Sequence, residues 1–344
     1  MSWNKNYRMN WYRTSVTELS GTSFIYYKKG EYKMREKKLK YLLLMVCMFA
    51  FCVTSCGKKS GGANQQVSSQ EAVTEPAVTS QSSEDVQPAQ PDMEEVDYQK
   101  YFDNLNGGAV FYDVNANKYY IYNKEICERQ DSPCSTFKII STLMGLHEHV
   151  LTDMDTRMGY DGTVYPMDLW NKDLGLNDAF KASCVWYFRK VIDKVGQEKV
   201  KHYVDDLQFG NCDISAWNGT GEREPANLNG FWLGSSLKIS AVEWVDVLNK
   251  IYNGSTEFSS SEVDILTNIM YTDDIGGAKI YGKTGTGGPD ADGKVDNGWF
   301  VGKCDVQEKT YCFAVHLTEP ASKDVSGPKA QMIASSIIQN EFSN

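Results

Sequence analysis

The spacing of apolar and polar positions predicts strands at both ends of a folded region. Gly108 to Val114 and Lys118 to Tyr122 alternate in polarity and are rich in aromatic residues. The three residues between them have turn character, which indicates a β-hairpin. Near the carboxyl end, strand patterns separated by turn residues recur at residues 278–286, 299–304 and 310–317.

Helical spacing dominates the middle of the chain and returns at its end. A helix is predicted after Pro133, because proline is tolerated in the first helical turn and an apolar run with helical spacing follows. Further helical patterns cover residues 168–201, 237–252 with Ser240 as N-cap, and 329–339, whereas residues 213–229 have loop character. Helices between an early hairpin and late strands predict an α/β fold of the α+β type: an antiparallel sheet flanked by helices, plus a helical subdomain.

The segment before this region has the features of an export signal. Basic residues between Lys33 and Lys40 precede an apolar run from Tyr41 to Val53, which is too short for a convincing permanent membrane span. The ending Val-Thr-Ser-Cys resembles a bacterial lipobox, which implies a signal peptide over residues 34–56 and a lipid on Cys56. An uncleaved anchor is the alternative. Met34 is then the expected start, and residues 1–33 are untranslated or disordered.

Residues 57–97 predict a disordered tether, because they are rich in small and polar residues and contain no aromatic residue. The folded domain is therefore expected over residues 98–344, outside the cytoplasm and anchored to a membrane by lipid. The net charge is −10, and no basic stripe with aromatic residues follows Cys56. Nucleic acid is accordingly not an expected partner.

Cysteine and histidine patterns do not indicate a metal site. No C-x-x-C pair is present, and His147 and His149 lie in a His-Glu-His sequence rather than in H-E-x-x-H. We therefore expect a surface role for these histidines. Cys304 and Cys312 flank a turn between two predicted strands, so a disulfide across the hairpin is possible, although sequence alone does not establish the pairing.

The pattern with the most chemistry is Ser135-x-x-Lys138 at the start of the predicted helix. Residues three apart share one helix face, so the amine is within reach of the hydroxyl at the positive end of the helix. Lysine can activate serine as a base if burial favours its neutral form. Taken alone, the four-residue pattern favours an ordinary helix start, because such patterns recur by chance.

Three further patterns occur in a definite order. Ser183-Cys184-Val185 supplies a second hydroxyl, and Phe231-Trp232 supplies an aromatic pair. Lys283-Thr284-Gly285-Thr286 occupies a predicted strand, where Lys283 would provide a fixed positive charge and Gly285 would let a substrate backbone approach. Each pattern is weak alone, but together they indicate one site.

In these motifs the chain resembles the penicillin-recognising serine enzymes, and within them the class D β-lactamases and the sensor domains of inducible β-lactam receptors. The resemblance implies that Ser135 is the nucleophile and that Lys138 becomes a base through carbamylation by CO2, with no other cofactor. It further implies that Ser183 relays a proton and that the backbone amides of Ser135 and Thr286 form the oxyanion hole. The remaining implied roles are substrate binding by Lys283, Thr284, Gly285, Thr286 and Val185, and stabilisation of the carbamate by Trp232.

Some positions depart from the family pattern. Phe209 stands where many relatives have tyrosine, and the segment before Phe231 is longer than usual, so Trp217 is an alternative to the favoured Trp232. The arginine that often assists carboxylate binding is not evident. Lys329 is a possible substitute, but it lacks the bidentate fork of arginine.

The resemblance leaves three functions open. The first is a lipoprotein β-lactamase that hydrolyses β-lactam antibiotics and confers resistance. The second is a sensor domain that is acylated once and then stalls. The third, a peptidoglycan transpeptidase, is disfavoured because valine replaces asparagine at position 185 in the S-x-N pattern.

Overall fold

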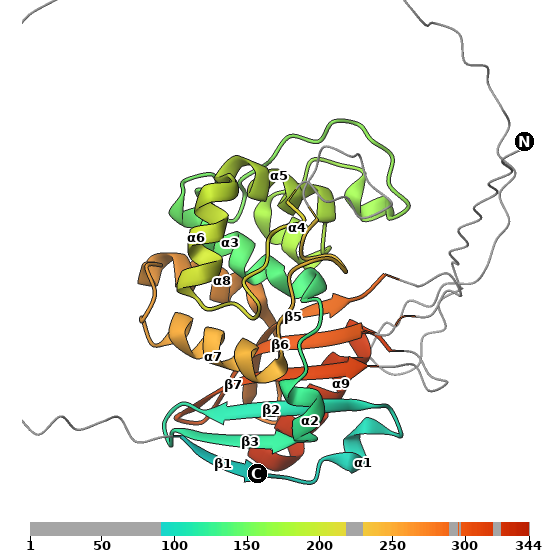
Figure 1. Cartoon of the computed structure of the whole chain (residues 1–344), viewed down its shortest axis with the longest axis vertical. Helices are drawn as coiled ribbons and strands as arrows, with labels where there is room; N and C mark the ends of the chain where they lie inside the picture. Colours follow the sequence, from blue (N-terminus) through green and yellow to red (C-terminus); the bar gives the residue numbers. More distant parts are fainter. Residues whose placement is uncertain (1–90, 218–229, 289–294, 296, 319–324, 344) are drawn as a thin grey trace, which may run out of the picture. The chain divides into compact units, whose positions relative to one another are not determined.

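A computed structural model describes residues 91–217, 230–288, 295, 297–318 and 325–343 (Figure 1). The predicted signal peptide, Cys56 and most of the predicted tether lie outside these residues, as does most of the loop expected at residues 213–229. Across the described ranges, no helix combines the length and the apolar character that crossing a bilayer requires.

One seven-stranded sheet forms the centre of the described region, in the order β1-β3-β2-β7-β6-β5-β4. Every neighbouring pair is antiparallel except β1 and β3. The predicted α+β architecture is confirmed, including the hairpin and the three late strands. The strands are β1 (Asp92–Glu95), β2 (Gly107–Asp113), β3 (Lys118–Tyr122), β4 (Tyr271–Ile275), β5 (Ala278–Thr286), β6 (Asn297–Val306) and β7 (Lys309–Thr318).

The sequence predicts a tether that extends to residue 97, but residues 92–95 form strand β1 of the sheet. All four residues are exposed, so apolar burial gave no signal for them. The strand is held by its parallel pairing with β3 and by ion pairs of Lys118 with Asp92 and Glu94. The folded domain therefore begins before Tyr98.

Helices cover both faces of the sheet (Figure 1). One face carries α9, with α1 beside it, whereas α7 and the helices around α3 pack on the other. The helices are α1 (Gln99–Phe102), α2 (Lys124–Glu128), η1 (Cys134–Phe137), α3 (Lys138–His147), η2 (Asp168–Trp170), α4 (Leu176–Lys181), α5 (Val185–Val195), α6 (Gln197–Asp206), α7 (Ala241–Tyr252), α8 (Ser260–Met270), α9 (Gly327–Ile337) and η3 (Ile338–Phe342).

The central strands alternate between two apolar cores. On β6, for example, Trp299 and Val301 face the core of the helical subdomain, whereas Phe300 faces α9. The same alternation separates Cys304 from Cys312, since Cys304 lies opposite Tyr311 and belongs to the α9 core. Both thiols are free, so the disulfide considered from the sequence does not form in this structure.

Helix ends follow the local capping chemistry. Ser240 caps α7 as predicted and forms a reciprocal capping box with Glu243. The closing helix α9 begins at Gly327 rather than Lys329, because the Ser326 hydroxyl accepts a hydrogen bond from the Lys329 amide and starts the helix earlier.

Candidate active site

Ser135 lies in a short 3-10 turn, η1, that leads directly into α3. The Lys138 Nζ lies 2.9 Å from the Ser135 Oγ, so the turn brings amine and hydroxyl together as the sequence predicts. The residue before the serine, Cys134, has a φ of 51°. This left-handed conformation costs a residue with a side chain about 1–2 kcal/mol, so surrounding contacts must stabilise it.

Lys138 is fully buried. Burial lowers its pKa to about 7, because the charged form loses its hydration, although the neighbouring thiols of Cys184 and Cys134 favour the charge. The Nζ atom lies 5.6 Å from the centre of the Phe188 ring on α5. A large neutral fraction near pH 7 is the condition for this amine to accept a proton.

A second pair joins Ser183 and Lys283. The Lys283 Nζ on β5 donates a 2.7 Å hydrogen bond to the Ser183 Oγ and a 2.8 Å bond to the Thr284 carbonyl oxygen. Ser183 was expected within a helix, but it lies in the link between α4 and α5 with a φ of 54°. The left-handed residue ends one helical segment, and Val185 starts the next, half-buried.

Burial disfavours the positive charge that the sequence context leads us to expect on Lys283. It is 4% exposed, and burial lowers its pKa well below the ordinary value, with further lowering by Lys138 and Lys181. A substrate carboxylate beside this amine would raise the pKa again, because an opposite charge favours the protonated form. Binding of such an anion would therefore favour the protonated form of Lys283.

The two pairs belong to one site. A Cβ atom at Gly285 would lie 3.0 Å from the Pro133 carbonyl oxygen and 3.0 Å from the Thr136 methyl carbon. A side chain at this position would press on the Ser135 turn, because β5 packs against that turn, and the expected approach of a substrate backbone at Gly285 stays a prediction.

Aromatic side chains connect the two lysines across the site. The Lys283 Nζ lies 5.7 Å from the centre of the Phe180 ring, and Phe180 contacts Phe188, the ring beside Lys138. Both phenylalanines are buried. They help to exclude water from both amines, and this burial disfavours the charged forms.

Trp232 is fully buried, and its Nε1 has no hydrogen-bond partner among the described residues. Its ring lies 5.6 Å, between centroids, from Phe137, the residue before Lys138. Trp217 instead stacks on Phe231 at 5.8 Å and is only partly buried. Burying an N–H group without a hydrogen-bond partner costs free energy of folding. Trp232 is therefore the better candidate to donate a hydrogen bond to an acceptor group on Lys138.

The positions that depart from the family pattern have identifiable surroundings. Phe209 packs edge-on against Phe137 and Trp244, so it contributes an aromatic wall. Lys329 is half-buried in the first turn of α9. The first turn of α9 packs on strand β5, where the Gly327 amide donates a 2.9 Å hydrogen bond to the Thr286 Oγ1.

The histidines of the His-Glu-His sequence have other partners. His147 lies 3.2 Å from the Glu262 carboxylate, and no cluster of metal-ligating side chains occurs within the described part of the chain. Sequence reasoning missed Asn297 and His316, which lie behind the Ser135 turn. The only sequence signal for Asn297 is its position directly before Gly298-Trp299, where a predicted strand begins.

Comparison with known proteins gives consistent results. Residues 103–339 match the family model described as penicillin binding protein transpeptidase domain. The chain is 34% identical to the regulatory protein BlaR1 of Bacillus licheniformis over 247 residues, or 71% of this chain and 39% of that protein. It is 35% identical to β-lactamase OXA-1 of Escherichia coli over 204 residues, or 58% of this chain and 71% of that enzyme.

Solved structures agree with these sequence matches. The C-terminal domain of the Bacillus licheniformis BlaR penicillin receptor aligns with a TM-score of 0.66 at 32% identity, covering 75% of this chain and all of that domain. The class D β-lactamase BAT-2 aligns with a TM-score of 0.62 at 28% identity, covering 71% and 94%. The chain spans only about two fifths of the length of the BlaR1 relative.

Proposed function

The chain belongs to the penicillin-binding protein transpeptidase family, and from that premise we propose that it is a serine β-lactamase. Ser135 would open the β-lactam ring and form an acyl-enzyme, which water then hydrolyses. The observation that carries the proposal is the buried Lys138 amine, with a pKa of about 7, at 2.9 Å from the Ser135 hydroxyl. A base poised near neutral pH is suited to proton transfer.

Acylation follows from the placement of the two pairs. Lys138 accepts the hydroxyl proton while the Ser135 Oγ attacks the lactam carbonyl carbon. The amides of Ser135 and Thr286 stabilise the oxyanion. Ser183, which is hydrogen-bonded to Lys283, relays the hydroxyl proton from Lys138 to the lactam nitrogen as the bond between that nitrogen and the carbonyl carbon breaks.

We assign substrate binding to strand β5 and to residues that lie next to it. Lys283 and Thr284 hold the substrate carboxylate, and this contact keeps Lys283 protonated. Val185, at the amino end of α5, gives the apolar contact beside Ser183. Gly285 acts indirectly, because its missing side chain allows β5 to lie against the Ser135 turn.

Deacylation requires a base that remains available after Ser135 is esterified. The surroundings of Lys138 fit a carbamate formed with CO2, because only a neutral amine reacts with CO2 and the Trp232 Nε1, on a ring that lies against Phe137, is an unpaired buried donor. When present, this group supplies an anionic oxygen base. Trp232 would hold it by donating a hydrogen bond from the indole nitrogen.

A second candidate function is a β-lactam sensor that is acylated and not hydrolysed. It is favoured by the match to the regulatory protein BlaR1, which extends over 71% of this chain. It is also favoured by the alignment with the BlaR penicillin-receptor domain over that domain's whole length. Both functions use the same acylation chemistry and differ only in whether water hydrolyses the acyl-enzyme.

Steady-state hydrolysis of a chromogenic cephalosporin by the purified protein, with and without bicarbonate, separates the two. We expect sustained turnover that rises with bicarbonate and is lost in Lys138→Ala. A single stoichiometric burst indicates the sensor instead. If the protein neither hydrolyses the cephalosporin nor forms a covalent adduct with it, measured by intact mass, both functions are contradicted.

We also propose export and lipid anchoring through Cys56, supported by the basic, apolar and small-residue pattern of residues 34–56. Expression in a bacterial host should give a membrane-bound form whose mass includes the lipid. Cys56→Ser should release the protein from the membrane fraction. An unchanged membrane fraction in that variant contradicts attachment at this residue.

A further inference from the structure

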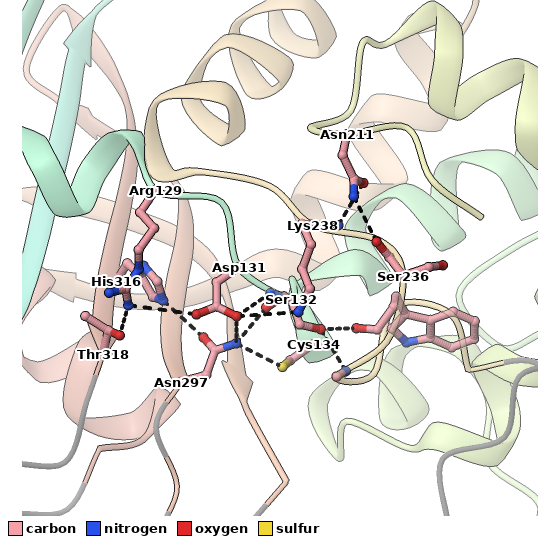
Figure 2. A network of polar contacts seen from close by, with 12 residues as sticks. Arg129, Asp131, Ser132, Cys134, Asn211, Ser236, Lys238, Asn297, His316 and Thr318 are labelled. Carbon is pink, nitrogen blue, oxygen red and sulfur yellow. Dashed lines mark hydrogen bonds and ion pairs between the residues drawn. The ribbon is translucent and has the colours of Figure 1, made fainter. Parts of the chain in front are cut away.

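A polar network lies directly behind the nucleophile turn and centres on Ser132 (Figure 2). The Ser132 carbonyl oxygen accepts two hydrogen bonds from strand β6: one from the Asn297 Nδ2 at 2.9 Å and one from the Trp299 Nε1 at 3.0 Å. Asn297 is 4% exposed and Ser132 is 2% exposed. The backbone three residues before Ser135 is thus fixed to the sheet by two buried donors.

The other side of Ser132 is fixed to the segment that carries Trp232. The Ser132 hydroxyl donates to the Trp232 carbonyl oxygen at 2.8 Å and accepts from the Gly234 amide at 2.8 Å. The Cys134 amide donates to the same Trp232 carbonyl oxygen at 3.0 Å. The turn that carries Ser135 therefore connects the sheet with the backbone of Trp232, whose ring lies against Phe137.

Asn297 is itself oriented by His316 on β7. The His316 Nε2 lies 3.1 Å from the Asn297 Oδ1, and the two groups are buried together. Since the Asn297 Nδ2 is engaged by Ser132, its oxygen must accept, and His316 must carry its hydrogen on Nε2. The His316 ring stacks on Trp299 with centroids 3.6 Å apart, which fixes its plane.

We propose that Asn297 and His316 are positioning residues for acylation, and that the hydrogen-bond chain from His316 through Asn297 to the Ser132 carbonyl holds Ser135 at the distance from Lys138 that proton transfer requires. The proposal rests on the proposed acylation of Ser135. Neither side chain touches the reacting atoms, and both act through the backbone of residues 132–135.

The backbone at the turn explains why such a restraint is needed. Cys134 is held in a left-handed conformation, with a φ of 51°, directly before the nucleophile. Its relaxation would rotate Ser135 away from Lys138. A misplacement of about 1 Å can slow an enzymatic reaction about 10²-fold, so a restraint on this turn changes the rate more than it changes substrate affinity.

The first test replaces Asn297 with alanine and separates affinity from chemistry. Single-turnover acylation by benzylpenicillin, followed by intact mass over a range of concentrations, gives the dissociation constant and the limiting acylation rate. For Asn297→Ala we expect a limiting rate about 10²-fold lower with a dissociation constant changed less than about threefold.

Thr310→Ala is the matched control. Thr310 lies on the same pair of strands at the opposite end, where its hydroxyl donates to Asp305. We expect its acylation rate to stay at the wild-type value even if its melting temperature falls. An acylation rate in Asn297→Ala equal to that of Thr310→Ala overturns the proposal.

A pair of His316 variants distinguishes hydrogen bonding from packing. His316→Gln keeps a nitrogen donor near the Nε2 position but loses the ring that stacks on Trp299, whereas His316→Phe keeps a ring and loses the donor. We expect His316→Gln to acylate within about threefold of the wild type and His316→Phe about tenfold more slowly. The opposite order shows that His316 acts only through stacking and overturns its positioning role.

These experiments separate the positioning role from the proposed function. If the wild-type protein neither forms an adduct with benzylpenicillin nor hydrolyses it, acylation of Ser135 itself is wrong. If the wild type forms the adduct and the variants react equally fast while remaining folded by circular dichroism, acylation stands and the positioning role is wrong.

Discussion

The site contains two lysine–serine pairs that are alike in chemistry and different in origin. In both, a buried lysine nitrogen lies within 3 Å of a serine hydroxyl, at 2.9 Å for Lys138 with Ser135 and 2.7 Å for Lys283 with Ser183. The first pair is three residues apart in the sequence, and the second is 100 residues apart. A helical turn brings the first pair together, whereas the packing of β5 against the α4–α5 link brings the second together.

The comparison shows how one apolar environment can give two amines different tasks. Burial lowers the pKa of both lysines. Lys138 stays beside Phe188, where its neutral form can act as a base. The Lys283 amine also donates to the Thr284 carbonyl oxygen, an acceptor that favours the protonated amine and therefore the binding of an anionic substrate. We therefore expect changes at the first pair to affect chemistry and changes at the second to affect binding and proton return.

Removal of each hydroxyl gives the largest expected difference. Ser135→Ala should abolish the covalent adduct with benzylpenicillin, because no other group is placed to attack. Ser183→Ala should still form the adduct, about 10²–10⁴-fold more slowly, since it loses a proton-transfer group and not the nucleophile. Intact mass spectrometry over time measures both. An adduct in Ser135→Ala contradicts the assigned nucleophile.

Removal of each amine should differ in affinity as well as in rate. Lys138→Met should lower the limiting acylation rate about 10²–10⁴-fold with little change in substrate affinity, because it removes the general base. Lys283→Met should mainly weaken binding of a carboxylate-bearing β-lactam. If both variants change the acylation rate and the substrate affinity equally, the assignment of Lys138 to proton transfer and Lys283 to substrate binding is wrong.

Lys138→Met should also stabilise the protein at neutral pH. The pKa of Lys138 falls from 10.5 to about 7 on folding. Burying the charge therefore opposes folding most strongly below pH 7, and the penalty disappears as the pH rises towards 10.5. We expect the substitution to raise the free energy of unfolding by about 1–4 kcal/mol at pH 7. Chemical denaturation at pH 7 and pH 10 measures the effect, which should shrink at the higher pH.

The pH dependence should show opposite responses of the two pairs. Below the Lys138 pKa of about 7, the amine is protonated, so the limiting acylation rate should fall about tenfold per pH unit. Affinity for a carboxylate-bearing substrate should instead weaken as the pH rises, because Lys283 loses its proton. Stopped-flow acylation between pH 5 and pH 9, a range of about four units around the expected transition, measures both. A pH-independent limiting rate contradicts Lys138 as the base.

The smallest expected effect comes from a change at Gly285, where strand β5 contacts the turn that carries Ser135. Gly285→Ala places a methyl group 3.0 Å from the Pro133 carbonyl oxygen and from the Thr136 methyl carbon. We expect a loss of about 1–3 kcal/mol in the free energy of unfolding, as for other overpacked positions. Acylation should slow by a few-fold, because the Ser135 turn shifts against β5. Wild-type stability and rate in this variant contradict the tight packing of the strand on the turn.

Local rules predicted the elements that depend on neighbouring residues. Alternation gave the β2–β3 hairpin and the late strands, and helical spacing gave the helix that follows Ser135. Strand β1 escaped prediction because backbone pairing and ion pairs, rather than apolar burial, hold it in place. The Ser183 link was taken for a helix, because its apolar neighbours continue the helical pattern although its own backbone is left-handed.

The sequence by itself determined the pairing of Ser135 with Lys138, because residues three apart on one helical turn must lie together. It also determined the order of the motifs and, through the alternation of apolar residues, the class of fold. Only the tertiary structure decided that Lys283 meets Ser183, that Trp232 is fully buried with an unpaired indole nitrogen whereas Trp217 is partly buried, and that Asn297 and His316 stand behind the nucleophile. Burial, pKa and long-range hydrogen bonds depend on which distant residues exclude water together, and that information exists only once the sheet and the helical subdomain have packed.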